Sequence, residues 1–301
     1  MNPNTSFERV NSLERLSTRV HDAADQTTGG EPRYRRMVRL GVNLLDDELN
    51  QGNTLEAAGE QLISLMIDHF ERGGLSLNDP AYDAFPEFRD YAQSLPPAPF
   101  FKTSGLNSLA NQYADVRRAT LDRSGNFETD GRHAIHLMAL AVPYSLQYYP
   151  ELRPGIIAAD SLLHDFPEVI TGDTSTFGMS HADYAIKVAR EQGGMPRLKQ
   201  EFGSEHARLF QAIHSYEEQD HPEASYTKAF DKEDAYFTHL TNKGFQFVER
   251  YKLQSAEEFI ESTVPTTERI KTYKQTFPLL QEDRAEFIRR LAECTDWPIA
   301  N

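Results

Sequence analysis

Apolar residues recur along this chain at intervals of three and four, which is the period of an amphipathic helix. Leu13, Leu16 and Val20 share one face near the N-terminus, and the pattern is stronger over residues 54–72. Further helices are predicted over residues 106–120, 132–148, 154–165, 180–192, 203–218, 225–250, 255–261, 266–276 and 281–293. Alternating apolar and polar runs of useful length are absent, so the sequence predicts an all-α fold.

The clearest break in this helical pattern is the proline-rich run at residues 94–99. Clustered prolines cannot continue a helix, because each lacks an amide donor and clashes with the preceding turn. We therefore expect an N-terminal helical extension over residues 1–100 and a second domain over residues 101–301. No candidate chemistry is found in the extension. Its His21-Asp22 pair lies on a polar stretch, where we expect a solvated helix face.

The charge of the chain narrows the range of partners. The 301 residues include 46 acidic and 31 basic ones, for a formal net charge of −15. An acidic surface repels a nucleic-acid backbone, whereas a small phosphorylated molecule needs only one or two well-placed basic groups. No uncharged apolar run approaches the roughly 18 residues of a membrane span. The N-terminus lacks the pattern of a secretory signal. We expect no polymeric nucleic acid, no membrane partner and a cytoplasmic location.

The pair His164-Asp165 is the most informative feature of the sequence. It follows an apolar helix opened by Pro154, so it is expected at the end of a packed element. Adjacent helical side chains point about 100° apart, and the two can therefore flank one metal ion with a nitrogen and an oxygen ligand. Glu168 lies one turn beyond His164 on the same face, where a carboxylate can orient or deprotonate a bound water.

A His-Asp pair alone is common, so a metal site needs further ligands. Upstream, His133 stands in the first turn of an apolar helix, with His136 as its local rival. Downstream, Asp231 lies in a helical and partly apolar segment, and Asp234 competes with it. We favour Asp231, because the segment then divides into polar and apolar faces.

Residues 115–240 resemble the HD-domain phosphohydrolases, in which a histidine, a His-Asp pair and a distant aspartate occur in this order. The resemblance is closest to the 5′-deoxynucleotidases and related deoxynucleotide phosphohydrolases. Their string His-Asp-x-x-Glu-Val-x-x-Gly-Asp is met at every fixed position by residues 164–173. The resemblance implies an HD-domain helical bundle, and it does not cover residues 1–100.

The resemblance also implies roles for individual residues. The implied ligands of one divalent ion are His133, His164, Asp165 and Asp231. Glu168 would assist the attacking water, and Asp173 would lie near the sugar. An arginine ahead of the first ligand would contact the phosphate, and Arg118 is its best positional match, with Arg117 as substitute. As an alternative, Asp173 simply caps the helix that follows it.

The sequence departs from this branch at three places. Ala134 stands where the branch usually has Ser or Thr, and Ala119 stands where an aromatic residue often follows the arginine. Residues 174–177 replace a proline-rich run. These changes leave the predicted metal site intact, and they bear on the identity of the substrate.

Two histidines and two aspartates with open positions suit Mn²⁺, Co²⁺, Fe²⁺, Zn²⁺ or Ni²⁺. We expect a metal-activated water, held by Glu168, to attack the phosphorus of a deoxynucleoside 5′-mono- or triphosphate. Two other functions stay open: a dinuclear phosphodiesterase or oxygenase of the HD type, and a non-catalytic nucleotide-sensing module. A homo-oligomer with residues 1–100 at its interface also stays open.

Overall fold

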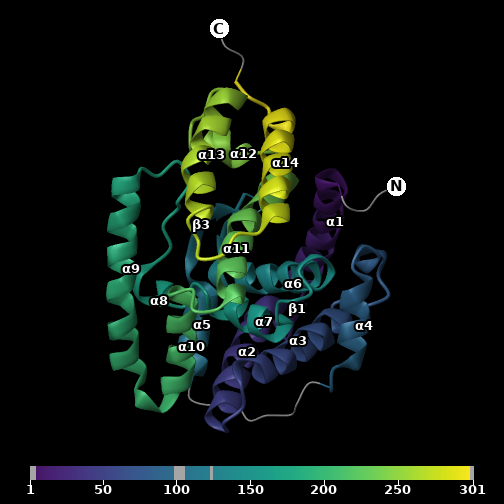
Figure 1. Ribbon diagram of the computed structural model, residues 1–301, viewed down its shortest axis with the longest axis vertical. Coiled ribbons are helices and arrows are strands. Elements are labelled where there is room, and N and C mark those ends of the chain that lie inside the picture. The colour runs from purple at the N-terminus through teal and green to yellow at the C-terminus, as the bar shows by residue number, and fades with distance from the viewer. Residues whose placement is uncertain (1–4, 98–105, 123–124, 299–301) are drawn as a thin grey trace.

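The computed structural model describes residues 5–97, 106–122 and 125–298, which form a bundle of helices with two short hairpins (Figure 1). The prediction of an all-α fold is confirmed. Within the described ranges, no helix combines the length and the apolarity that a membrane crossing requires.

The helices are α1 (Ser6–Asp25), α2 (Arg33–Asn50), α3 (Leu55–Arg72), α4 (Pro86–Ser94), α5 (Asn107–Asp115), α6 (Asp130–Tyr148), α7 (Pro154–Leu163), α8 (Glu168–Thr171), α9 (His181–Phe202), α10 (Ala207–Glu217), α11 (Pro222–Thr241), α12 (Phe245–Glu249), α13 (Ala256–Ile270) and α14 (Pro278–Cys294). Short 3₁₀ turns are η1 (Pro80–Tyr82) and η2 (Ser204–His206). The antiparallel hairpins pair β1 (Thr27–Thr28) with β2 (Glu31–Pro32), and β3 (Arg117–Leu121) with β4 (Phe127–Thr129).

The helix predicted over residues 106–120 is only half correct. Helix α5 ends at Asp115, and the chain continues as strand β3. Tertiary contacts stabilise the strand, because β4 pairs with it and the Gln246 side chain bonds to its backbone. The Leu121 amide donates to Gln246 Oε1 at 2.7 Å, and Gln246 Nε2 donates to the Ala119 carbonyl at 3.2 Å. Helix propensity depends on neighbouring residues in the sequence, so it does not predict contacts with residues far along the chain.

Two other helix predictions need correction. The helix expected over residues 225–250 is interrupted at Gly244, whose φ of 68° places it in the left-handed region that favours glycine. The helices expected over residues 255–261 and 266–276 are one helix, α13, with Pro265 inside it. Burial of Phe259 and Ile270 on the packed side of α13 offsets the hydrogen bond that the proline removes.

Helices α6 and α7 lie at the centre of the bundle. Almost all of α7 is buried, as is α6 from its first turn to Ser145. Helix α3 packs against α7, and the contact is close because glycines face each other. A Cβ atom added to Gly59 would lie 1.7 Å from the carbonyl oxygen of Gly155, so only glycine fits at this contact.

The N-terminal helices belong to the same hydrophobic core as the rest of the chain. Helix α1 packs against α6 and α14. Its Arg9 guanidinium is buried and forms an ion pair with Asp283 at 2.8 Å, and the Tyr144 hydroxyl donates to the same carboxylate at 2.5 Å. The predicted division near residue 100 stays a prediction, and residues 98 and 99 of the proline-rich run lie outside the described residues.

Candidate metal centre and its pocket

His133 occupies the first turn of α6, where the Thr129 hydroxyl caps the helix by accepting from the Arg132 amide. The His133 ring is 1% exposed, and carboxylates lie on both of its nitrogens. Its Nε2 lies 2.9 Å from Asp231 Oδ1, and its Nδ1 lies 2.9 Å from Asp234 Oδ2. The ring orientation is therefore fixed from both sides.

His164 follows the last residue of α7, at the end of a buried helix as expected. Its Nδ1 donates to the Ser161 carbonyl at 2.9 Å, so Nε2 is the ring nitrogen that faces the other candidate ligands. This Nε2 is buried and has no hydrogen-bond partner, although Asp165 Oδ2 lies 2.8 Å away and Asp231 Oδ1 lies 3.7 Å away. A buried basic nitrogen without a donor is suited to a metal ion.

The ligand atoms of His133, His164 and Asp231 all lie within 4.8 Å of one another, and Asp165 adjoins them through His164. Imidazole nitrogens and carboxylate oxygens from helices α6, α7 and α11 are a donor set that fits a divalent transition-metal ion. The structure thus brings together the predicted ligand residues.

The competing residues on α11 have different surroundings. Asp231 lines the pocket and is paired with the Lys232 amine, whereas Asp234 lies behind His133 and accepts a hydrogen bond from His136 Nδ1 at 2.7 Å. Burial alone would raise the pKa of Asp231, but Lys232, His133 and His164 hold it well below its usual range. Asp231 is therefore an ionised group that faces the site.

The charge around His133 favours a cation. Burial and Arg118 oppose protonation of the ring, yet its hydrogen bonds to the carboxylates of Asp231 and Asp234 raise its pKa to about 10. For Asp165, burial is outweighed by His164 and Arg118, which hold the pKa of this carboxyl below its usual range. Ionised carboxylates around a basic nitrogen are what a bound metal ion requires.

Glu168 is the first residue of the short helix α8 rather than a continuation of α7, because the preceding helix ends at Leu163. Its carboxyl nevertheless lines the pocket, and its oxygens approach those of Asp130 and Asp165 within 4.8 Å. Burial, followed by the charges of Asp165 and Asp130, raises the pKa of Glu168 well above its usual range. A carboxyl group with a raised pKa is suited to proton transfer.

The two candidate arginines lie in different places. Arg118 lines the pocket, with Nη1 2.5 Å from Asp165 Oδ2 and 3.3 Å from Asp130 Oδ1. Arg117 is exposed, and its guanidinium packs over the Phe127 ring at 3.4 Å from the centroid. Neighbouring residues of a strand point to opposite faces, so of the two arginines it is Arg118 that β3 presents to the site.

Asp173 lines the same pocket, and its carboxylate accepts a hydrogen bond from the Ala119 amide of β3. The alternative that it caps the following helix is wrong, because Ser180 caps α9 by accepting from the Asp183 amide. Asp173 therefore joins β3 to the segment that follows α8.

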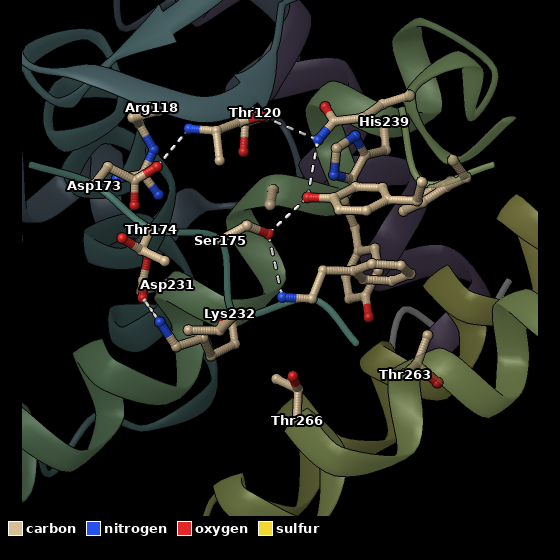
Figure 2. Close-up of a pocket in the computed structure, with 18 of the residues that line it drawn as sticks. Arg118, Thr120, Asp173, Thr174, Ser175, Asp231, Lys232, His239, Thr263 and Thr266 are labelled. Atoms are coloured by element: carbon tan, nitrogen blue, oxygen red, sulfur yellow. Dashed lines mark hydrogen bonds and ion pairs between the residues drawn. The ribbon is translucent and has the colours of Figure 1, made fainter. Parts of the chain in front are cut away.

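The pocket has a cavity of about 120 Å³, which is lined by helices, strand β3 and residues 173–177 (Figure 2). Figure 2 shows Arg118, Asp173 and Asp231 on one side, and His239, Thr263 and Thr266 on the other. In a chain of net charge −15, the cationic residues that line it are Arg118, Lys187, Lys232 and Arg284. The last three of these residues were not predicted from the sequence. Of these three, only Lys232 could have been found from the sequence, because it directly follows the predicted ligand Asp231.

The expected solvated face at His21 is wrong. His21 is 3% exposed, and its ring stacks on that of His136 with centroids 3.9 Å apart. Another histidine, His239, lines the pocket, and burial lowers its pKa to about 4, so it is a neutral group there. The polarity of the neighbouring residues in the sequence does not show that the rings of His21 and His239 are buried.

Comparison with known proteins gives one match. A family model described as HD domain matches residues 110–287, which include the residues of the candidate centre that lie in α6, α7, α8 and α11. No curated protein and no solved structure matches the chain.

Proposed function

The chain belongs to the HD-domain family, and from this membership we propose that it is a metal-dependent phosphohydrolase whose substrate is a deoxynucleoside 5′-phosphate. Family membership suggests metal-dependent hydrolase activity in general. The narrower proposal of a nucleotide substrate rests on two further grounds. These are the chemistry of the pocket and the match of residues 164–173 to the deoxynucleotidase string.

One observation carries the proposal. His133, His164 and Asp231 gather ligand atoms within 4.8 Å at a pocket that also contains a cationic arginine and a buried glutamate. A metal ligand set, a phosphate-binding cation and a candidate acid-base group are the parts that phosphate-ester hydrolysis needs. In the proposal, His133, His164, Asp165 and Asp231 hold one divalent transition-metal ion.

A divalent ion bound there would supply Lewis acidity to a phosphoryl oxygen and lower the pKa of a water. The residues of the chain perform the other steps. Glu168 orients the attacking water and, in its ionised form, accepts the proton of that water. Arg118 is held beside Asp165 at 2.5 Å and offers its remaining N–H donors to the phosphate oxygens. Lys187 and Lys232 add positive charge at the same pocket.

The single-ion proposal is supported by the position of Arg118. Asp130, Asp165 and Glu168 form a second group of carboxyls within 4.8 Å, where another cation would be attracted. The Arg118 guanidinium already lies between Asp165 and Asp130, and it supplies a fixed positive charge at that place. We therefore favour one metal ion and an arginine over a dinuclear centre.

The test is metal analysis of the purified protein, followed by phosphate release from ribo- and deoxynucleoside mono- and triphosphates. We expect a stoichiometric transition-metal ion and release of phosphate from deoxy substrates. His214→Ala is the control, because this histidine is exposed on α10 and should leave both results unchanged. A protein that binds no transition-metal ion contradicts the proposal. Metal and nucleotide binding without turnover would favour the sensing module.

A further inference from the structure

A continuous row of buried polar side chains runs from helix α1 to the candidate metal centre. The Ser17 hydroxyl of α1 lies 2.8 Å from His136 Nε2 of α6. His136 Nδ1 lies 2.7 Å from Asp234 Oδ1 of α11, and Asp234 Oδ2 lies 2.9 Å from His133 Nδ1. None of the four residues is more than 1% exposed.

The two hydrogen bonds to Asp234 have only one consistent direction. An ionised aspartate is an acceptor only, so both imidazole Nδ1 atoms must donate to Asp234. The other ring nitrogen of His136, Nε2, is bonded to the Ser17 hydroxyl at 2.8 Å. His133, which donates from Nδ1, presents Nε2 to the candidate metal centre. The Ser17 hydroxyl therefore fixes one end of a row whose other end is the ligand atom.

The His136 ring is held from its face as well as from its edge. His21, one turn after Ser17 on α1, stacks on it at 3.9 Å between centroids with an interplanar angle of 10°. Helix α1 therefore contributes a hydroxyl and a ring to the position of His136. Both contacts come from a helix that lies outside residues 110–287, the part of the chain that the family model matches.

We propose that Ser17, His136 and Asp234 are positioning residues that hold the His133 ring in the tautomer and orientation that bind metal, so that helix α1 completes the metal centre. The inference rests on the proposed metal site. Hydrogen-bond partners behind a histidine ligand fix its tautomer and raise its basicity, and their loss typically weakens metal binding about 10- to 100-fold.

The experiment compares Ser17→Ala and Asp234→Asn with the wild type and with Ser12→Ala. Ser12 is a buried serine on the same helix, and it is bonded to Arg15 rather than to the row. The readouts are the Mn²⁺ dissociation constant and the melting temperature with and without Mn²⁺. We expect weaker Mn²⁺ binding by about 10- to 100-fold for Asp234→Asn. Ser17→Ala should show a smaller loss of the same kind, and Ser12→Ala should bind as the wild type does.

A purely structural role gives a different result. Ser17→Ala would then lower the melting temperature equally with and without Mn²⁺ and leave the dissociation constant unchanged, and this outcome overturns the inference. If Asp234→Asn does not fold, Ser17→Ala decides the matter alone, because it removes a single hydroxyl. A wild type that binds no Mn²⁺, Co²⁺, Fe²⁺, Zn²⁺ or Ni²⁺ would overturn the proposed function together with this inference, whereas normal binding by Ser17→Ala overturns the inference only.

Discussion

The site has two walls that are built in different ways. The ligand wall is the group of candidate ligands on α6, on α11 and directly after α7. Its residues His133 and His164 are 1% and 3% exposed, and its Asp165 and Asp231 line the pocket. The substrate wall consists of β3, residues 173–177 and α12, and residues 173–177 are half-buried.

The His133 ring is fixed by buried hydrogen bonds on both of its nitrogens. His164 is fixed by its place directly after the end of α7. In the substrate wall, residues 173–177 are irregular backbone, which the contact between Asp173 and the Ala119 amide joins to β3.

This difference separates two kinds of chemistry. A metal ion needs its ligands in a narrow geometry, and packed helices supply that rigidity. A loop and a short strand tolerate replacement of side chains, so the substrate wall is where specificity can change without loss of the metal. We therefore expect substitutions in the ligand wall to act on metal binding, and those in the substrate wall to act on substrate preference.

The largest effect is expected in the ligand wall, for His164→Ala and Asp165→Ala. Each removes a proposed ligand, so bound metal and phosphate release should both be lost. Metal analysis and the phosphate assay on the same preparation measure the two properties. Retention of stoichiometric metal and full turnover by either variant would remove that residue from the ligand set.

The next largest effect is expected for Glu168→Gln. Glu168 lies between the two walls. The amide keeps the size of the side chain but cannot accept a proton, so kcat should fall by roughly 10²–10⁴-fold. Metal content should stay at the level of the wild type. If metal is lost together with activity, Glu168 is a ligand, and the boundary between the walls must be redrawn.

A smaller effect is expected for Arg118→Ala in the substrate wall, where charge-assisted hydrogen bonds to phosphate would be lost. Such bonds contribute about 1.5–3 kcal/mol, so kcat/KM should fall roughly 10- to 150-fold. Arg117→Ala is the matched control, because the neighbouring arginine packs over Phe127 outside the pocket. Equal losses for the two variants would count against a direct contact of Arg118 with substrate.

The smallest effect is expected for Asp173→Ala. An aspartate packed against the C2′ side of the sugar would leave no room for a 2′-hydroxyl, so the wild type should prefer deoxy substrates. The variant should lose most of that preference and keep its metal. The measurement is kcat/KM for matched ribo- and deoxynucleotides, and an unchanged ratio would assign Asp173 only to the contact with the Ala119 amide.

The sequence predicted the ligand wall much better than the substrate wall. Helices around the centre have strong apolar periodicity, and the string at residues 164–173 places His164, Asp165 and Glu168 within one short stretch. The choice of Asp231 over Asp234 followed from the polarity of helix faces. The structure gives Asp231 the place beside His164, while both aspartates contact His133.

The parts that could not be predicted depend on contacts between distant segments. Strand β3 exists because β4 and Gln246 bond to it, and Gln246 lies 125 positions after Leu121. Lys187 and Arg284 reach the pocket from α9 and α14, and no local pattern in the sequence marks them. His21 stands in a polar stretch, and its burial depends on the packing of α1 against α6.

The ion pair between Arg9 and Asp283 also has a consequence for how the molecule is made. These residues are 274 positions apart, so at a synthesis rate of 5–20 residues per second α14 emerges roughly 15 to 55 s after α1. A buried guanidinium without its partner is strongly unfavourable. The Arg9 guanidinium therefore gains its buried partner only after α14 has been synthesised.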